Sequence, residues 1–296
     1  MRYYSLNMYY KKKYGEKVRK ISVDAGFTCP NRDGKKGEGG CIYCDVSSFV
    51  HVPEGGIKNQ VKEQINKSQS KGVNKFSVYF QSYSNTYGDI GLIVDRINEA
   101  LIDDRIVEIS IGTRPDVVEN DKLEVLKKRF EKYNIVIELG LQSKHNKTLE
   151  LINRGHTFED FDDAVDRIKA YGFGVCAHII LGLPYENEKM MLETVKYVSD
   201  KHLDFVKFHH LHILKGTKLE QLYIKGDFSL LSEDEYIYIL GESIKILDKD
   251  IVISRLVGDS PKNITVAPDW PESKLSFLNR FNQYLEYKNI WQGCGG

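Results

Sequence analysis

The sequence predicts an α/β fold, a partial (β/α)6 TIM-like barrel with an N-terminal and a C-terminal extension. From residue 56 onward, short apolar and β-branched runs alternate with stretches of helical periodicity. Repeated βα units at this spacing make a parallel sheet, because each crossover helix returns the chain to the same end of the sheet. The 296 residues, 41% of them hydrophobic, are enough for one large barrel or two small domains.

Six βα units are expected in the order of the chain. The strands are predicted at 18–23, 75–80, 106–111, 134–141, 173–181 and 204–213. The helices are predicted at about 57–70, 89–101, 121–132, 146–171, 187–200 and 232–248. Six units are too few for a closed eight-stranded barrel but suit a partial one, whose active site lies at the carboxyl ends of the strands. We therefore expect an N-terminal extension (1–17), a core barrel (18–249) and a C-terminal extension (250–296).

The composition narrows the class of protein. Forty-two basic and forty-two acidic residues cancel, so the global charge does not indicate a nucleic-acid partner. We expect no membrane segment, because no run of about 18 apolar residues appears and the first residues lack the apolar core of a signal peptide. Three of the five cysteines lie close together, which suits a reducing compartment and argues against a disulfide framework. The sequence thus predicts a cytoplasmic protein.

Basic and aromatic side chains alternate in residues 1–20. Seven basic residues and five tyrosines accompany a single acid, Glu16. This pattern suits a surface that follows a nucleic-acid backbone and stacks on bases. A solvated lid packed by its tyrosines is an equally good interpretation.

The loop from Cys29 to Cys44 holds three cysteines, Cys29, Cys41 and Cys44, among several glycines. Three thiolates can hold a [4Fe–4S] cluster and leave one iron open to bind a cofactor or substrate. The same thiols with His51 could instead form a Cys3His zinc site. Two features favour the cluster: the loop follows a predicted strand, and Tyr43 offers an aromatic face that a structural zinc loop does not need.

Polar residues gather after the predicted strands. They include residues 81–86 after the second strand, 112–116 after the third, 142–143 after the fourth and 153–156 shortly beyond it. The carboxyl ends of parallel strands meet at one edge of the sheet, so these side chains should form a common rim. A cofactor with a carboxylate, a sulfonium, ribose hydroxyls and an adenine needs such a rim.

Four motifs, taken in their order along the chain, resemble those of radical S-adenosyl-L-methionine (SAM) enzymes of the elongator and oxygen-independent coproporphyrinogen dehydrogenase superfamily. The shared motifs are Cys-Ile-Tyr-Cys at 41–44, Glu-Leu-Gly-Leu-Gln-Ser at 138–143, Asn-Arg-Gly-His at 153–156 and His-Ile-Ile-Leu-Gly-Leu-Pro at 178–184. Three further stretches, at 23–34, 81–86 and 255–259, are similar to the bacterial YtqA/YhcC type. The resemblance therefore covers nearly the whole chain.

The resemblance implies a barrel of the radical SAM type, a [4Fe–4S] cluster on Cys29, Cys41 and Cys44, and S-adenosyl-L-methionine as cofactor. The reduced cluster of such enzymes cleaves SAM to a 5′-deoxyadenosyl radical. The resemblance implies that Gln142 and Arg154 bind SAM. The full set of predicted cofactor-binding residues is Tyr43, Gln81, Asn85, Thr113, Glu138, Gln142, Ser143, Arg154, His178 and Leu211. Two departures stand out: His178 replaces a ribose-binding Asp, and eleven residues separate Cys29 from Cys41, an insertion typical of elongator-type members.

Several candidates have a second interpretation. Glu138 could be a buried, paired carboxylate with a structural role instead of a SAM contact. His210 and His212 share one side of their strand and could contact the substrate or the adenine, or fill the core. Cys176 is expected to be a small buried apolar residue.

The YtqA-type resemblance implies a role in modifying the wobble uridine side chain of tRNA. Its partners would be tRNA and a reductant such as flavodoxin or ferredoxin. Two alternatives are a radical SAM enzyme acting on a small, tetrapyrrole-like molecule, and a zinc-containing RNA-binding protein without catalysis.

Overall fold

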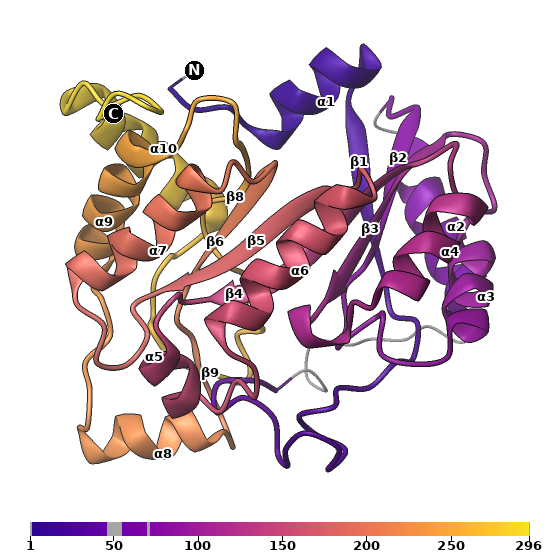
Figure 1. Ribbon diagram of the computed structural model, residues 1–296. Coiled ribbons are helices and arrows are strands. Elements are labelled where there is room, and N and C mark those ends of the chain that lie inside the picture. The colour runs from indigo at the N-terminus through magenta and orange to yellow at the C-terminus, as the bar shows by residue number, and fades with distance from the viewer. Residues whose placement is uncertain (1, 46–54, 70–71, 296) are drawn as a thin grey trace.

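The strands of the computed structural model, which describes residues 2–45, 55–69 and 72–295, form one curved parallel sheet (Figure 1). Its order is β1-β2-β3-β4-β5-β6-β8, so each strand lies beside the next strand of this sheet along the chain. The strands are β1 (Val18–Val23), β2 (Lys75–Phe80), β3 (Ile106–Thr113), β4 (Asn134–Gln142), β5 (Gly174–Leu181), β6 (Phe205–His210) and β8 (Val252–Arg255). The predicted α/β class and partial barrel are confirmed.

The prediction of six strands was one strand short, because the sheet has seven among the described residues. The seventh, β8, has only four residues, too few for its alternation to show in the sequence. It pairs with β6 across the intervening helices, so part of the expected C-terminal extension completes the sheet. The last predicted strand, 204–213, is also two strands: β6 ends at His210, and β7 (Ile213–Leu214) pairs antiparallel with β9 (Thr265–Ala267).

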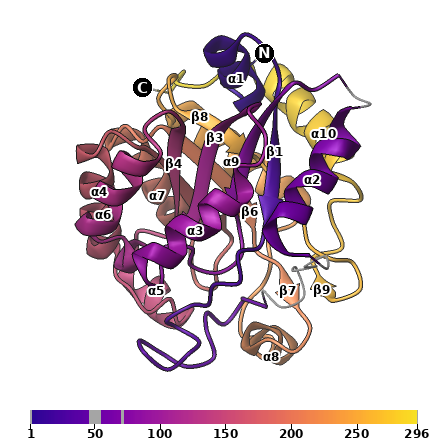
Figure 2. The same ribbon diagram turned by 90° about the vertical axis from the view of Figure 1, so that its right-hand side faces the viewer.

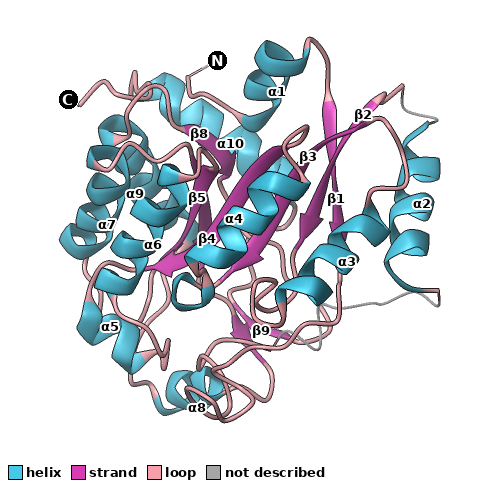
Figure 3. Ribbon diagram, turned by 45° about the vertical axis from the view of Figure 1, so that its right-hand side comes forward, coloured by secondary structure: helices cyan, strands magenta, loops and turns pink. Residues whose placement is uncertain are grey.

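The long helices lie on the outer side of the sheet (Figure 3). The helices are α1 (Leu6–Tyr14), α2 (Gly56–Gln69), α3 (Ile90–Ala100), α4 (Asn120–Arg129), α5 (Asn146–Leu151), α6 (Phe158–Ala170), α7 (Glu188–Asp200), α8 (Lys218–Lys225), α9 (Glu233–Ile246) and α10 (Lys274–Tyr287). In the part of the chain that the structure describes, no helix has both the length and the apolar character that a membrane crossing requires.

The single helix predicted over 146–171 is wrong, because the structure has two helices, α5 and α6, in its place. The chain adopts left-handed backbone angles at Asn153 (φ 50°) and Gly155 (φ 69°), which no α-helix accommodates. Thr157 then starts α6 with a capping box: its side chain accepts a hydrogen bond from the Asp160 amide, and the Asp160 carboxylate accepts one from the Thr157 amide. The break places Arg154 on a turn instead of a helix.

The two faces of the sheet bury different kinds of side chain. Successive strand residues point to opposite faces, so alternate positions form one layer. The outer layer is apolar and packs on the helices, as Ile21 and Val78 do. The inner layer is polar at mid-barrel and includes Lys20, Glu138 and Lys207. A charged layer therefore lies directly beneath the carboxyl ends of the strands.

Helix α1 closes the amino end of the barrel, the end opposite the cysteine loop (Figure 1). The Tyr10 hydroxyl donates to Glu108 at 2.6 Å, and the Tyr9 ring packs edge-on against Phe205 with 5.0 Å between centroids. Lys13 donates to Asn134 at 2.6 Å. These contacts support the interpretation of residues 1–20 as a lid packed by its tyrosines.

Candidate active site

The cysteine loop lies at the carboxyl ends of the strands, where α8, β7 and β9 also lie (Figure 2). Backbone hydrogen bonds fasten it at Ile42, whose amide donates to the Ile152 carbonyl and whose carbonyl accepts from the Leu219 amide, each at 3.0 Å. The loop is thus held between α5 and α8. The position agrees with the active-site location expected for a parallel barrel.

A cavity of about 270 Å³, here called the cysteine cavity, opens beside this loop. The predicted residues that line it are Cys29, Cys41, Tyr43, Cys44, Gln81, Thr113, Glu138, Gln142, Arg154 and His178. A second cavity of about 250 Å³, the histidine cavity, adjoins it and is lined by Leu211 together with His209, His210 and His212. Tyr43, Gln142 and His178 are among the residues that line both, so the two cavities are continuous.

Two predicted residues lie behind the wall of these cavities. Asn85 donates to the carbonyls of Phe80 (3.1 Å) and Gly112 (2.8 Å) and so ties the end of β2 to β3. Ser143 is fully buried and donates to Glu186. Both side chains hold the rim in place, and neither lines the two cavities.

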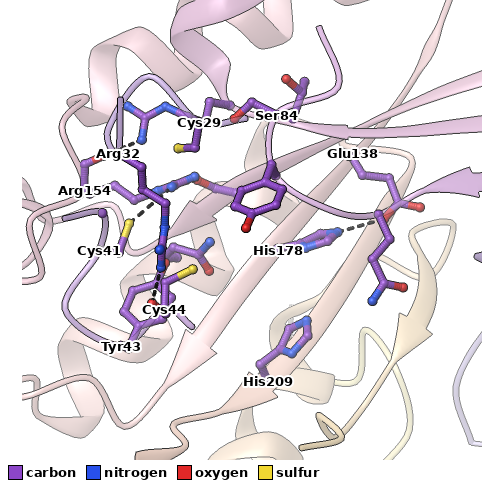
Figure 4. A pocket seen from close by; sticks show the side chains of 18 of the residues that line it. Cys29, Arg32, Cys41, Tyr43, Cys44, Ser84, Glu138, Arg154, His178 and His209 are labelled. Carbon is purple, nitrogen blue, oxygen red and sulfur yellow. Dashed lines mark hydrogen bonds and ion pairs between the residues drawn. The ribbon is translucent and has the colours of Figure 1, made fainter. Parts of the chain in front are cut away.

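The three thiols suit an iron–sulfur cluster better than a single metal ion. Figure 4 shows Cys29, Cys41 and Cys44 on one side of the pocket, with Glu138 and His178 on the other. Sulfurs around one zinc ion would lie about 4 Å apart, given Zn–S bonds of about 2.3 Å. Among the described residues these three sulfurs are not gathered within 4.8 Å of one another. His51, the fourth ligand of the zinc alternative, lies outside the described residues.

Cationic and amide donors surround the thiol of Cys41. Arg154 Nη1 lies 3.6 Å from its sulfur, and Asn31 Nδ2 lies 3.9 Å away. Asn31 also donates to the Asn153 carbonyl at 2.6 Å, so it joins the cysteine loop to the Arg154 turn. Both donors can hydrogen-bond to a cluster-ligating sulfur at this position.

The end of β4 is built to admit Arg154 and Gln142. A β-bulge interrupts the pairing of β4 with β5 between Gly140 and Gln142, and Gln142 has a left-handed φ of 67°. Arg154 Nη2 donates to the Gly140 carbonyl at 2.8 Å. A Cβ on Gly140 would overlap Arg154 Nη2 and lie 2.7 Å from Gln142 Nε2. A larger residue at position 140 would therefore displace the ends of both side chains.

Replacing Gly140 with alanine should therefore weaken SAM binding by about 10-fold or more, since a displaced charged hydrogen bond costs about 1.5–3 kcal/mol. Calorimetric titration of cluster-loaded protein with SAM measures the effect. A matched control is Gly226→Asn, at a left-handed helix end where a side chain has open space. Equal SAM affinity in both variants would contradict this role of Gly140.

Glu138 is a paired carboxylate that also lines the cysteine cavity. It accepts hydrogen bonds from Lys20 (2.5 Å), from Lys207 and from His178 (2.8 Å). Burial raises the pKa of Glu138. The ammonium groups of Lys20 and Lys207 and the His178 contact lower it by more than burial raises it, so the pKa lies well below its usual value. The two ammonium groups also argue against a metal ion at Glu138, Cys176 and His178, although these ligand atoms lie within 4.8 Å of one another.

The histidines of the two cavities are neutral at physiological pH. Burial is the main cause that lowers the pKa of His178 and of His212 to about 4 and that of His210 to about 2. Neighbouring positive or imidazole groups also lower each pKa, while Glu138 and Asp259 partly offset this at His178 and His212. His210 stacks on Trp270 with 4.5 Å between centroids. The histidine side of that cavity wall is therefore uncharged, while Arg255 and Asp259 add charged groups elsewhere in the wall.

Acid should destabilise the fold through these histidines. Their unfolded pKa is about 6.5 and their folded pKa is lower, so the unfolded chain binds more protons than the folded chain below pH 6.5. The free energy of unfolding therefore decreases as the pH is lowered. Each can contribute up to about 1.4 kcal/mol per pH unit. We expect His210→Phe to lose less stability than wild type between pH 7 and pH 5 in chemical denaturation. His202→Asn, at an exposed left-handed position, is the control and should keep the wild-type slope.

Several residues that line the cysteine cavity were absent from the predicted set. They are Arg32, Tyr79, Tyr83, Ser84, Arg114, His209 and Arg255, besides three glycines. Arg114 donates to the carbonyls of Arg154 (2.7 Å) and Gly155 (3.0 Å) and so holds the Arg154 turn. Its position directly after β3 is the signal that could have identified it. Arg255 ends β8, the strand that the sequence did not predict.

Comparisons with known proteins agree with this site. The model of the radical SAM superfamily matches residues 29–198, and a radical SAM C-terminal domain matches residues 203–287. YtqA of Bacillus subtilis is 35% identical over 99% of this chain and 92% of its own length, and YhcC of Escherichia coli is 33% identical over 94% and 91%. A tRNA uridine(34) acetyltransferase of Methanocaldococcus jannaschii is 31% identical over 58% of this chain and 31% of that protein.

The archaeal Elp3 of Methanocaldococcus infernus has the same fold, with a TM-score of 0.72 and 22% identity over 93% of this chain and 64% of that chain. The family match decides between the two interpretations of the cysteines: the cluster is confirmed and the zinc-binding alternative is wrong. Because the superfamily model covers more than half of the chain and YtqA matches nearly all of it, the chain belongs to the radical SAM superfamily as a YtqA/YhcC-type enzyme that uses a [4Fe–4S] cluster and SAM.

Proposed function

We propose that this enzyme modifies the side chain of the wobble uridine of tRNA. The observation that carries the proposal is the 31% identity to a tRNA uridine(34) acetyltransferase over 58% of the chain. The histidine cavity supports it, because a base that is flipped out of its stack can stack on the face of an uncharged imidazole ring. His209, His210 and His212 line that cavity, and Trp270 stacks on the His210 ring.

When bound, the reduced cluster cleaves SAM and supplies a 5′-deoxyadenosyl radical that can abstract hydrogen. The chain's own residues position the two reactants. Arg154 and Gln142 would hold SAM in the cysteine cavity, Arg154 through a charge-assisted hydrogen bond to the SAM carboxylate. A substrate in the histidine cavity would then meet SAM at the residues shared by both cavities, such as His178 and His209. A flavodoxin or ferredoxin in the cytoplasm would supply the electron.

The test is an anaerobic reaction of the reconstituted enzyme with SAM, dithionite and tRNA from a strain that lacks the gene. Mass spectrometry of the digested tRNA should show a changed wobble nucleoside, formed together with 5′-deoxyadenosine. SAM cleavage without any changed tRNA nucleoside would contradict the proposal and favour a small-molecule substrate, such as a tetrapyrrole-like one.

The surface that holds tRNA should lie at the cavity end of the barrel and not at α1. Lys215 and Lys218 are exposed beside the cysteine loop, whereas Lys11 and Lys12 are exposed on α1 at the opposite end. We expect Lys215→Gln with Lys218→Gln to weaken tRNA binding and to lower the salt dependence by about one log–log unit for each phosphate that is no longer neutralised. Lys11→Gln with Lys12→Gln is the matched control. The reverse result would show that residues 1–20 dock the tRNA.

A further inference from the structure

Arg255 brings a positive charge to the place where the two cavities meet. It is the last residue of β8, and it lines both the cysteine cavity and the histidine cavity. Its neighbour across the sheet is Lys207 of β6. Among the described residues, no carboxylate lies within 4.0 Å of its guanidinium and no acceptor receives a hydrogen bond from it.

In the described part of the chain, three carboxylates line the two cavities: Glu138, Asp45 and Asp259. Glu138 pairs with both Lys20 and Lys207, so these three side chains together carry a net charge of one positive unit. Asp259 lines the histidine cavity but pairs with Lys274 at 3.0 Å. Arg255 is half-buried and adds a positive charge beside the Glu138 group, which an anionic ligand at the junction would offset.

His209 faces the same junction. It lies on β6 two residues after Lys207, on the same face of the sheet, and it lines both cavities. Its Nε2 atom is buried and has no hydrogen-bond partner among the described residues. Gly258 backs the ring: a Cβ there would lie 3.2 Å from His209 Nδ1. The imidazole is therefore held in place while one nitrogen remains available to a ligand.

We propose that Arg255 and His209 form a binding site for an anionic group of the substrate, a carboxylate or a phosphate, at the junction of the two cavities. A guanidinium can grip either group with two parallel hydrogen bonds, and a neutral imidazole can donate a third. The site would fix the substrate against the cofactor by its charged end. The identification of the substrate as a nucleotide rests on the proposed function. The anion site itself rests on the positions of Arg255 and His209.

The test is calorimetric titration of cluster-loaded, SAM-bound enzyme. The probes are 5-carboxymethyluridine, its uncharged methyl ester, uridine 5′-monophosphate, acetate and inorganic phosphate. Arg255→Gln should lower the affinity for the anionic probe that binds by about 10- to 100-fold, because a charge-assisted hydrogen bond contributes that much, and should leave the ester unchanged. Arg255→Lys should recover part of the affinity, and His209→Phe should reduce it less than Arg255→Gln does.

Arg280→Gln is the control, since that arginine is half-exposed on α10 and pairs with Glu233 and Asp234. Unchanged cluster absorbance and melting temperature show that Arg255→Gln is folded. Preference for the carboxylate probe places the anion on the base, and preference for the monophosphate places it on the backbone. Either preference supports the site if Arg255→Gln removes it.

Two results would overturn the inference: equal binding of the anionic probes by Arg255→Gln and wild type, or a loss of SAM affinity alone, which would assign Arg255 to the cofactor. The proposed function fails in a different way. If acetate or phosphate binds through Arg255 while no uridine derivative binds, the anion site stands and the tRNA substrate does not.

Discussion

Serine in place of Cys41 should remove most of the iron from the protein and reduce SAM cleavage to background. We expect the three thiols to be the cluster's protein ligands, and a serine hydroxyl is a much weaker ligand for iron than a thiolate. Iron and sulfide analysis after anaerobic reconstitution, the visible absorption spectrum and 5′-deoxyadenosine release measure the result. The same outcome is expected for Cys29→Ser and Cys44→Ser, which line the same cavity.

Cys294→Ser is the matched control, because this cysteine lies in the C-terminal tail and does not line the cysteine cavity. It should retain about four irons per chain, the content of one cubane cluster. Full iron content in the Cys41 variant would contradict the assignment of the ligands. Stoichiometric zinc in anaerobically prepared wild-type protein would contradict it as well.

Glutamine in place of Glu138 should lower the free energy of unfolding by about 3–5 kcal/mol, the usual cost of removing one partner from a buried ion pair. The substitution leaves Lys20 and Lys207 without their shared anion, and Lys207 is almost fully buried. Chemical denaturation of the apoprotein at pH 7 measures the difference. Replacing Lys207 with methionine in the same chain should restore part of the stability, because it removes one of the unpaired charges.

The pH dependence of this variant gives a second readout. The pKa of Glu138 is well below its ordinary value of 4.5, so its stabilisation is complete above pH 4.5 and is lost as the pH falls toward the folded-state pKa. The difference between wild type and Glu138→Gln should shrink in acid. Glu124→Gln removes an exposed pair with Lys128 and should cost less than about 1 kcal/mol. Equal destabilisation by the two variants would mean that Glu138 is not a buried partner.

The sequence predicted best where neighbouring residues decide the outcome. The strand at 75–80 matches β2, and the strand at 18–23 matches β1, because alternation and turn residues are local signals. The cysteine loop was identified for a similar reason, since thiols at that spacing have few chemical uses. The helix predicted at 146–171 failed because two left-handed residues outweighed its apolar periodicity.

Some functional residues could likewise be predicted from local sequence, and others could not. Cys29, Cys41 and Cys44 indicate a metal or cluster site through residue type and spacing. The motifs that follow them along the chain allowed the sequence to indicate the cluster and the class of reaction. Asn85 belongs to a motif that predicted a cofactor contact. In the structure its side-chain amide donates to two backbone carbonyls behind the wall of the cysteine cavity, which the sequence could not show. Motif position alone does not tell which side of a wall a side chain faces.

Only the tertiary structure decided what surrounds the cluster site. The pairing of β8 with β6 joins residues about 50 positions apart and brings Arg255 beside Lys207, a pairing with no local signature. Packing against Phe205 and Glu108 likewise sent α1 to the amino end of the barrel, away from the cavities. Periodicity and residue chemistry act over a few residues, whereas charge balance and cavity shape arise from side chains that meet only after the sheet has formed.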